Sequence, residues 1–480
     1  MNKIKSLFGA QDMTVGSPFL GLLKFSIPLL IGSIAQMLYT TADRIIVSKF
    51  CGNDAMSALG ATMPIQNLFL VFFIAIGSGV TVMVSQYFGA KDNDNIGLCV
   101  GNSITLITIT SIVVTLASTP FTRQILTLLN TNEQFADMAY IYLFILFLGS
   151  AANGFYNVIG GIIRGLGDSV FPLLILMLTV VLNVVLDIWF VWWFSKIWGP
   201  VGGVAGAALA TIIAQYISAG ILVWKLLTMK KEIRLTKQTL IPRKNTVLQI
   251  TRLGLPTGIQ MAVMFLSNIV MQPSIMAIDI ATPAVPVFAT MTATMSIDGY
   301  AVLPSQSFSM AASTFTGQNI GAGKMDRVKK GAVTCFLMCF IFTAIMAVLI
   351  QYFGRDMFKL FTKADDPTTP AIIELGMSFL RIMIPAYVLM TINMTFTGVM
   401  RGAGDSIGTM VISLIVNVVL KVPLTLIMLK ITGDPIWIFL SMPICFVVGC
   451  AVTMIYYKKA DWRKHAVVTG EVKLEAPVIG

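Results

Sequence analysis

An amide and a carboxylate stand four residues apart inside a long apolar stretch of the chain. They are Asn183 and Asp187, and a spacing of four places both side chains on one face of a helix. Ionisable groups inside a membrane-length apolar segment are costly, so they mark a functional site by default. Amide and carboxylate oxygens are the ligands that a hard cation such as Na⁺ needs. The pair is therefore a candidate cation site.

Two further oxygen-bearing side chains are expected at the same depth. With a helical rise of about 1.5 Å per residue, Asp43 in the first apolar run and Asp187 in the fifth lie at similar heights, and Thr211 reaches that level in the sixth. We therefore predict that Asp43, Asn183, Asp187 and Thr211 form one cation-coupling site. Two desolvated carboxylates held close together also retain protons, so the sequence leaves both Na⁺ and H⁺ open as the coupling ion.

Each of these four residues also has a structural alternative. Asp43 precedes Arg44 and is also consistent with a solvated helix end, and Asn183 with a hydrogen bond between helices. Thr211 is of a type that often bonds the backbone of its own helix, and Asp187 can form a structural ion pair. Asp187 is the hardest to dismiss, because bulky apolar residues flank it.

Further polar residues in apolar runs are candidates for lining a substrate cavity. Gln36 and Tyr39 lie, at helical spacing, on the face of the first run that carries its acid. Asp298 is expected to pair with Lys421 or Arg381, or to contact the substrate. Lys421 occupies, in the second half of the chain, the position that an acid occupies in the first half, because the run 417–421 otherwise matches the run 183–187.

A glycine-rich hexapeptide occurs twice, 237 residues apart, at 164–169 and 401–406. The copies share an arginine, two glycines, an aspartate and a serine in register, which indicates two related halves. Neither has the strand–loop–helix setting and Gly-Lys-Ser/Thr ending of a nucleotide loop, which excludes ATP binding. We expect structural turns in which the arginine pairs with the aspartate, and in which the aspartate or serine caps the next helix. The residues assigned to these turns are Arg164, Asp168, Arg401 and Asp405.

The composition is that of an integral membrane protein. Hydrophobic residues make up 56% and charged residues 11% of the 480 residues, and the mean hydropathy is +0.84, whereas a soluble domain carries about 25% charged residues. Apolar runs of about 20 residues recur along the chain, without the alternation of barrel strands. We predict an all-α membrane protein with about twelve transmembrane helices.

The two halves are expected to form two six-helix bundles. Each half has an even number of helices, so the halves are parallel repeats, which place the substrate at their interface. The expected segments are an N-terminal lobe (1–228), a cytoplasmic linker (229–245), a C-terminal lobe (246–457) and a cytoplasmic tail (458–480).

Lysine and arginine are distributed unevenly between the two sides of the membrane. With the N-terminus in the cytoplasm, 23 of the 33 basic residues fall on cytoplasmic segments and 8 on outer segments. This is the positive-inside pattern. It predicts a multi-pass protein of the cytoplasmic membrane with both termini cytoplasmic, and it explains the net charge of +11 without a nucleic-acid partner.

The remaining chemistry-bearing residues exclude several functions. The six cysteines contain no Cys-x-x-Cys pair, so they indicate neither a disulfide framework nor a metal site. The only histidine, His465, lies in the polar tail, which excludes histidine-based metal or acid–base chemistry inside the membrane. No nucleophile–base pair is present, so we expect no enzyme and no cofactor apart from the coupling ion.

The landmarks of the chain, in order and with their repetition, resemble the multidrug and toxic-compound extrusion (MATE) family of cation-coupled exporters. They are Ile27-Pro28 followed by Asp43, and the runs 86–90, 164–169, 183–187 and 317–323. The resemblance covers residues 14–457 and implies two bundles that form a V around a central cavity. It implies export of organic cations, often amphipathic, driven by entry of Na⁺ or H⁺. It also assigns Asp43, Asn183, Asp187 and Thr211 to the family's N-lobe cation site.

One departure from the family affects the C-lobe. Some branches use a glutamate of the seventh helix as a second coupling acid, whereas residues 254–277 contain no acid. A C-lobe coupling site is therefore in doubt unless Asp298 takes its place.

The lead function is a drug and organic-cation antiporter that works by alternating access, as a monomer in the lipid bilayer. The alternative is a lipid-linked saccharide flippase of the same superfamily. Its cavity must hold a pyrophosphate and should be strongly cationic, whereas here one lysine, joined at most by Arg381, faces at least two acids. A receptor or scaffold would not need buried ionisable groups at matched repeat positions.

Overall fold

The computed structural model describes residues 11–128, 133–230, 233–281, 287–362, 368–434 and 436–468. Within these residues the regular secondary structure is helical throughout, with no strand. Helices satisfy the backbone polar groups of each apolar run internally, which a lipid environment demands. The all-α fold predicted from the composition is confirmed.

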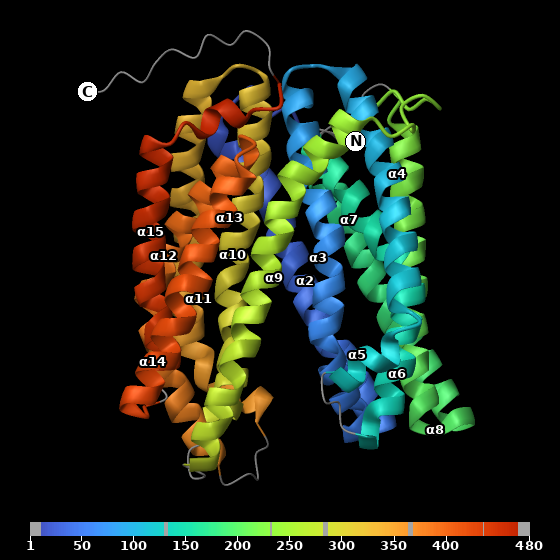
Figure 1. Ribbon diagram of the computed structural model, residues 1–480, viewed down its shortest axis with the longest axis vertical. Helices are drawn as coiled ribbons and strands as arrows, with labels where there is room; N and C mark the ends of the chain where they lie inside the picture. Colours follow the sequence, from blue (N-terminus) through green and yellow to red (C-terminus); the bar gives the residue numbers. More distant parts are fainter. Residues whose placement is uncertain are drawn as a thin grey trace.

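The first half of the chain forms one helical bundle, the N-lobe (Figure 1). Its helices are α2 (Pro18–Cys51), α3 (Asn53–Gly89), α4 (Asn93–Ser118), α5 (Thr122–Leu128), α6 (Glu133–Leu148), α7 (Ser150–Gly165) and α8 (Val170–Thr228). The buried apolar side chains of α3, α4, α7 and α8 form its main core.

Helix α8 contains two membrane segments, which correspond to the predicted fifth and sixth helices. Its 59 residues break at Trp198 and Gly199, where the backbone leaves the helical region with φ values of −122° and 68°. Glycine adopts the positive φ at little cost, because it has no Cβ. The two segments run antiparallel, since the hydroxyls of Thr179 and Ser218, 39 residues apart, are hydrogen-bonded at 2.5 Å.

The second half forms the C-lobe. Its helices are α9 (Lys244–Ala281), α10 (Val287–Gly321), α11 (Met325–Phe361), α12 (Thr369–Gly402), α13 (Ser406–Leu414), the π-helical turn η1 (Ile415–Lys421), α14 (Val422–Thr432) and α15 (Trp437–Lys459). A short 3₁₀ turn, η2 (Trp462–His465), follows. π-Helical turns inside helices are rare and often lie at functional sites.

Length and composition support a membrane-spanning bundle. Eight helices of the described chain are long and apolar enough to cross a membrane, and the bent pair α6–α7 makes a ninth span. In this count α8 appears once although it contains two segments, and 406–432 is one span made of α13, η1 and α14. Helices α9 and α10 run through the C-lobe beside these spans (Figure 1).

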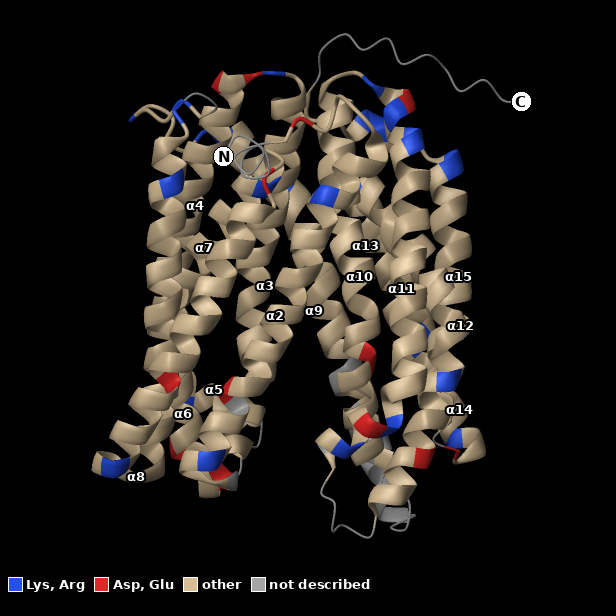
Figure 2. Cartoon of the chain, turned by 180° about the vertical axis from the view of Figure 1, so that it is seen from behind, with Lys and Arg blue, Asp and Glu red and all other residues tan. Residues whose placement is uncertain are grey.

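The two lobes form a V. They converge at the end where the described chain begins and finishes and part toward the opposite end (Figure 1). Helix α3 of the N-lobe packs against α9 and α10 of the C-lobe, and α2 also contacts α10. Charged residues gather toward the two ends, whereas the middle of the bundle is nearly free of them (Figure 2).

Both ends of the described chain cross from one lobe to the other where the lobes converge. The backbone N–H of Met13 donates to Gln318 of the C-lobe at 2.9 Å, and Arg327 donates to the carbonyl oxygen of Met13 at 3.0 Å. The backbone N–H of Val467 donates to Gln86 of the N-lobe at 2.7 Å. The N-terminal segment is thereby attached to the C-lobe, and the C-terminal segment to the N-lobe.

Candidate functional site

Helix α2 and the two segments of α8 bring the four predicted coupling residues together inside the N-lobe. Asn183 and Asp187 lie one turn apart on the first segment of α8, Thr211 faces them from the second segment, and Asp43 approaches from α2. Asn183 and Asp187 have no exposed surface, and Thr211 and Asp43 are 7% and 8% exposed. Carboxyl groups removed from water in this way need hydrogen bonds, a proton or a cation to offset their desolvation.

Asn183 connects two members of this cluster. Its amide nitrogen donates to Oδ2 of Asp187 at 2.6 Å, and its amide oxygen accepts from the backbone N–H and the hydroxyl of Thr211 at 3.2 and 3.3 Å. The surrounding hydrogen bonds set this orientation, since the opposite one would turn the amide oxygen toward a carboxylate that can only accept. The amide therefore fixes Asp187 against the second segment of α8.

The carboxyls of Asp43 and Asp187 are the titratable part of the cluster. The two groups lie within hydrogen-bonding reach of each other. Because an ionised carboxylate can only accept hydrogen bonds, this contact requires a proton, or a cation, between the two groups. The hydroxyl of Tyr39 lies close to the side chain of Thr211 and to both acids. The arrangement can hold one proton or one small cation.

The C-lobe has different chemistry at the equivalent helix. Asn417, the repeat partner of Asn183, donates to the backbone oxygen and the hydroxyl of Ser413 in its own helix, at 3.0 and 3.2 Å. Lys421 stands at the end of η1, where the N-lobe has its acid, and is 8% exposed. The C-lobe therefore has no equivalent of the carboxyl pair among its described residues.

Asp298 on α10 is a half-buried acid of the C-lobe. Its Oδ1 accepts a hydrogen bond from the hydroxyl of Tyr387 on α12 at 2.5 Å, and the charge of Lys421 lies close to it. Arg381, the other predicted partner, is exposed on the surface of α12. Asp298 is thus held by the C-lobe itself, through a tyrosine and a lysine.

A cavity of about 780 Å³ lies between the two lobes. Helices α2, α7 and α8 line it from the N-lobe, and α9, α10, α12 and α15 from the C-lobe. Gln36 and Asp298 are among its lining residues, and so are five methionines: Met37, Met295, Met310, Met383 and Met442. Methionine thioethers adapt to ligands of different shapes, so this surface suits varied apolar molecules.

Two residues predicted to line the cavity do not do so. Tyr39 and Lys421 are absent from the lining. Three residues turn a helix by about 300°, so Tyr39 points about 60° away from Gln36 on α2. It therefore joins the N-lobe acid cluster instead of the cavity, whereas Lys421 is buried near Asp298.

The twin turns are built without the expected arginine–aspartate pairs. Among the described residues, no ion pair joins Arg164 to Asp168 or Arg401 to Asp405. Asp168 accepts from two backbone N–H groups at the start of α8, both at 3.0 Å. Asp405 accepts from a backbone N–H of α13 at 2.9 Å and from a tyrosine hydroxyl of α15 at 2.8 Å. Burial raises the pKa of Asp168, although these N–H donors and nearby Lys225 act against the rise.

The aspartates thus act as helix caps, which leaves the two arginines free for another role. Arg164 lines the central cavity, and both Arg164 and Arg401 line a second cavity of about 490 Å³ between the lobes. Arginine side chains are long enough to reach away from their turn, and the backbone N–H groups satisfy the aspartates without them.

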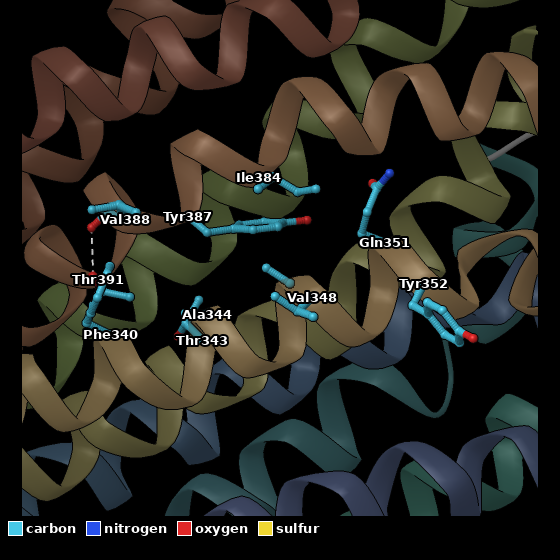
Figure 3. A pocket seen from close by; sticks show the side chains of 11 residues that line it. Phe340, Thr343, Ala344, Val348, Gln351, Tyr352, Ile384, Tyr387, Val388 and Thr391 are labelled. Carbon is cyan, nitrogen blue, oxygen red and sulfur yellow. Dashed lines mark hydrogen bonds between the residues drawn. The ribbon is translucent and has the colours of Figure 1, made fainter.

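A hollow of about 470 Å³ lies on the C-lobe between α11 and α12 (Figure 3). The ring of Tyr387 lies between Ile384 and Val348 (Figure 3), and its hydroxyl reaches Asp298. The hollow is almost entirely apolar, and Val348 is 68% exposed on its rim. It is a lipid-facing groove whose inner wall, Tyr387, separates it from the acid of the central cavity.

The helical repeats match a known family in both halves of the chain. The family model described as MatE matches residues 28–189 and 256–427. The chain belongs to the MatE family. The resemblance inferred from the sequence landmarks is therefore confirmed, and the two matched regions correspond to the two lobes.

This MatE chain has relatives along nearly its whole length. It is 26% identical to the probable multidrug resistance protein NorM of Thermotoga maritima, with 94% of both chains covered. It is 25% identical to the probable multidrug resistance protein YoeA of Bacillus subtilis, over 92% of this chain and 94% of the relative. A MATE family transporter of the MOP superfamily in an outward-facing conformation has the same fold, with a TM-score of 0.84 at 22% identity over 94% of this chain and 98% of that chain. Members of the family are transporters, and these relatives support multidrug export as the general role.

Two glutamines join the lobes of this MatE protein in a way that the sequence analysis did not anticipate. Gln86 on α3 donates to the carbonyl oxygen of Gly402 at 2.9 Å, and Gln318 on α10 donates to that of Gly165 at 3.2 Å. We call these two bonds the glutamine clamp. Each glutamine reaches the glycine that follows the arginine in the opposite lobe's turn. The signal was present in the sequence, because both glutamines occupy equivalent repeat positions.

Proposed function

We propose that the protein is a proton-coupled antiporter that exports organic cations and drugs across the cytoplasmic membrane by alternating access. The observation that carries this proposal is the contact between the buried carboxyls of Asp43 and Asp187. Family membership and the relatives named as multidrug resistance proteins support drug export. The methionine-rich cavity between the lobes is the proposed substrate site.

Two contacts favour H⁺ over Na⁺ as the coupling ion. A single proton shared between Asp43 and Asp187 satisfies two groups that are otherwise only acceptors. A Na⁺ site needs several oxygens that converge on one point. Asn183 instead presents its NH₂ group to Asp187, and its oxygen is already bonded to Thr211.

The V-shaped state fits the outward-facing step of such a cycle. With both termini in the cytoplasm, the parted ends of the lobes face the outside. A proton that enters there neutralises the carboxyl pair and removes a charge that is costly to bury. The coupling ion can bias the cycle only by binding one state more tightly than the other. Protonation must therefore favour the state that is closed to the outside and open to the cytoplasm. Substrate enters the cavity from the cytoplasm in that state.

Replacement of Asp187 by asparagine tests the coupling role. In proteoliposomes with independently imposed pH and Na⁺ gradients, Asp187→Asn should abolish gradient-driven efflux of a cationic dye while the protein still expresses and folds. Asp326→Asn, at a side chain that is 91% exposed on α11, is the matched control and should transport like the wild type. Full pH-driven efflux by the Asp187 variant would contradict the proposed coupling site. Efflux by the wild type that is driven only by a Na⁺ gradient would show that Na⁺, and not H⁺, is the coupling ion.

A lipid-linked saccharide flippase is the second candidate, and one observation favours it. Arg164 and Arg401 both line a cavity between the lobes, which makes that region more cationic than the sequence alone indicated. The same proteoliposomes decide between the two functions, because a flippase would translocate an anionic lipid-linked saccharide and leave cationic dyes in place.

A further inference from the structure

The second cavity between the lobes has an unusual balance of charge. It shares Arg164, Asn157 and Phe265 with the central cavity, so the two are parts of one space. Arg164 ends α7 and Arg401 ends α12, so the arginines lie toward the convergent ends of the lobes. No aspartate or glutamate is among the described residues that line it. Its other polar lining groups are uncharged hydroxyls and amides.

Within the described part of the chain, each of the two arginines has a hydrogen-bond donor that is not satisfied. The Nε of Arg164 and that of Arg401 are buried and have no hydrogen-bond partner among the described residues. None of the ion pairs in the described chain involves either side chain. A guanidinium carries five N–H donors and is always charged, and a buried charge is normally paired.

Their position at helix ends does not remove this imbalance. Each arginine lies in the last turn of its helix, where the helix dipole favours a positive charge by about 0.3–1 kcal/mol. That interaction stabilises the charge but uses none of the free N–H donors. Two guanidinium groups at equivalent repeat positions therefore present unused donors to one cavity. The group that best satisfies them is an oxyanion, which arginine binds in a bidentate manner.

We propose that this cavity binds the oxyanion, a carboxylate or a phosphate, of an amphipathic substrate between Arg164 and Arg401. The proposal rests on the proposed export function and narrows its substrate class. Asp298 lines the outer part of the same space, so the cavity is negative on one side and positive toward the convergent end. This order suits a molecule that carries both a cationic and an anionic group, with the anionic group directed toward the convergent end.

A matched pair of dyes tests the inference. Tetramethylrhodamine with a free carboxylate and its methyl ester share one cationic fluorophore and differ in the oxyanion. Binding is measured by fluorescence anisotropy on the full-length protein in nanodiscs of phosphatidylcholine alone, so that no anionic lipid competes. The wild type should bind the acid at least about tenfold more tightly than the ester, because hydrogen bonds to charged groups are strong. Inorganic phosphate and benzoate as competitors then show which oxyanion is preferred.

Variants locate the effect. Arg164→Gln and Arg401→Gln should each lower the affinity for the acid by about tenfold and leave that for the ester unchanged or higher. The affinity of Arg164→Lys for the acid should lie between that of the wild type and that of Arg164→Gln, because lysine keeps the charge but loses bidentate binding. Arg381→Gln, at an exposed arginine of the same helix as Arg401, is the matched control and should bind both dyes like the wild type.

Equal binding of the two dyes by the wild type overturns the inference. This outcome needs no variant, so the inference stays testable even if a variant misfolds. Equal weakening of both dyes in the glutamine variants also overturns it. Binding is measured at equilibrium without an ion gradient, so it is independent of coupling. Coupled efflux without a preference for the acid removes this inference alone, and a preference for the acid without coupled efflux removes only the proposed antiport.

Discussion

At the scale of single residues, one amide distinguishes the two halves of the repeat. Asn183 bonds Asp187 and Thr211 and so links the two segments of α8. Asn417 at the equivalent place bonds only Ser413 within its own helix and accepts, through its backbone oxygen, from a serine of α9. The same residue type is therefore part of the proposed coupling site in one lobe and of a local helix contact in the other.

Alanine at these two positions should have unequal effects. Asn183→Ala removes a donor to a buried carboxyl, an interaction worth about 1.5–3 kcal/mol, so coupled efflux should fall at least about tenfold. Asn417→Ala removes only a bond to Ser413 and should leave efflux within about twofold of the wild type. Initial rates of dye efflux at matched protein levels measure both. Comparable losses in the two variants would contradict a special role for Asn183.

At the scale of elements, the break in α8 determines whether the site can form. Asn183 and Thr211 are 28 residues apart in the chain and meet because the helix reverses direction around Trp198 and Gly199. Without this reversal the two segments would form one straight helix. At a rise of about 1.5 Å per residue, Asn183 and Thr211 would then lie about 42 Å apart. The glycine at φ 68° is therefore a structural requirement of the proposed coupling site.

Two glycines of α8 provide a matched test of this requirement. A Cβ at either Gly199 or Gly220 would meet nothing within 4 Å, so sterics with neighbours do not distinguish them. Gly199→Ala should destabilise the fold by about 1–2 kcal/mol, because alanine disfavours a positive φ. Gly220→Ala, inside the regular helix, should stabilise it by up to about 1 kcal/mol. Thermal unfolding of the purified protein measures both shifts, and shifts of the same sign would refute the explanation.

The sequence predicts elements and helix faces better than it predicts where long side chains end. The apolar runs and their polar break allow α8 to be expected as two segments, and the helical rise alone brings Asp43, Asn183, Asp187 and Thr211 to one depth. The ends of Arg164 and Arg401 were not predictable in the same way. Their direction depends on whether the aspartates of the turns are satisfied by backbone N–H groups, which only the folded structure settles.

At the scale of the whole molecule, the glutamine clamp holds the convergent ends of the lobes together. Gln86 and Gln318 each donate to the opposite lobe and also accept from a backbone N–H of a terminal segment. The two bonds obey the repeat symmetry, so separation of the lobes at this end must break both. The sequence shows that these glutamines occupy equivalent repeat positions, but repetition alone does not show that each one reaches the opposite lobe.

Loss of the clamp should shift the protein toward the state that is open at the convergent end. In Gln86→Ala/Gln318→Ala, the loss of two neutral hydrogen bonds, about 0.5–1.5 kcal/mol each, should raise the population of that state by roughly 5- to 150-fold. Spin labels at the exposed positions Asp94 and Lys330, one on each lobe, report the distance between the lobes.

A control variant distinguishes the effect of losing the glutamine clamp from the effect of replacing any glutamine by alanine. Gln66→Ala, whose amide donates to Thr62 within α3 at 2.8 Å, should leave the distance distribution unchanged. An unaltered distribution in the double variant would show that the glutamines do not hold the lobes.

The crossing of the two chain ends has a practical consequence for anyone who handles this protein. Met13 is bonded to the C-lobe and Val467 to the N-lobe, so each end is fastened to the lobe that it does not belong to. A fluorescent protein or an affinity tag fused close to Met13 or Val467 would pull on these attachments and bias the equilibrium between the access states. Long flexible linkers, or labels placed on exposed helix positions, would leave the equilibrium between the two access states as it is in the unmodified protein.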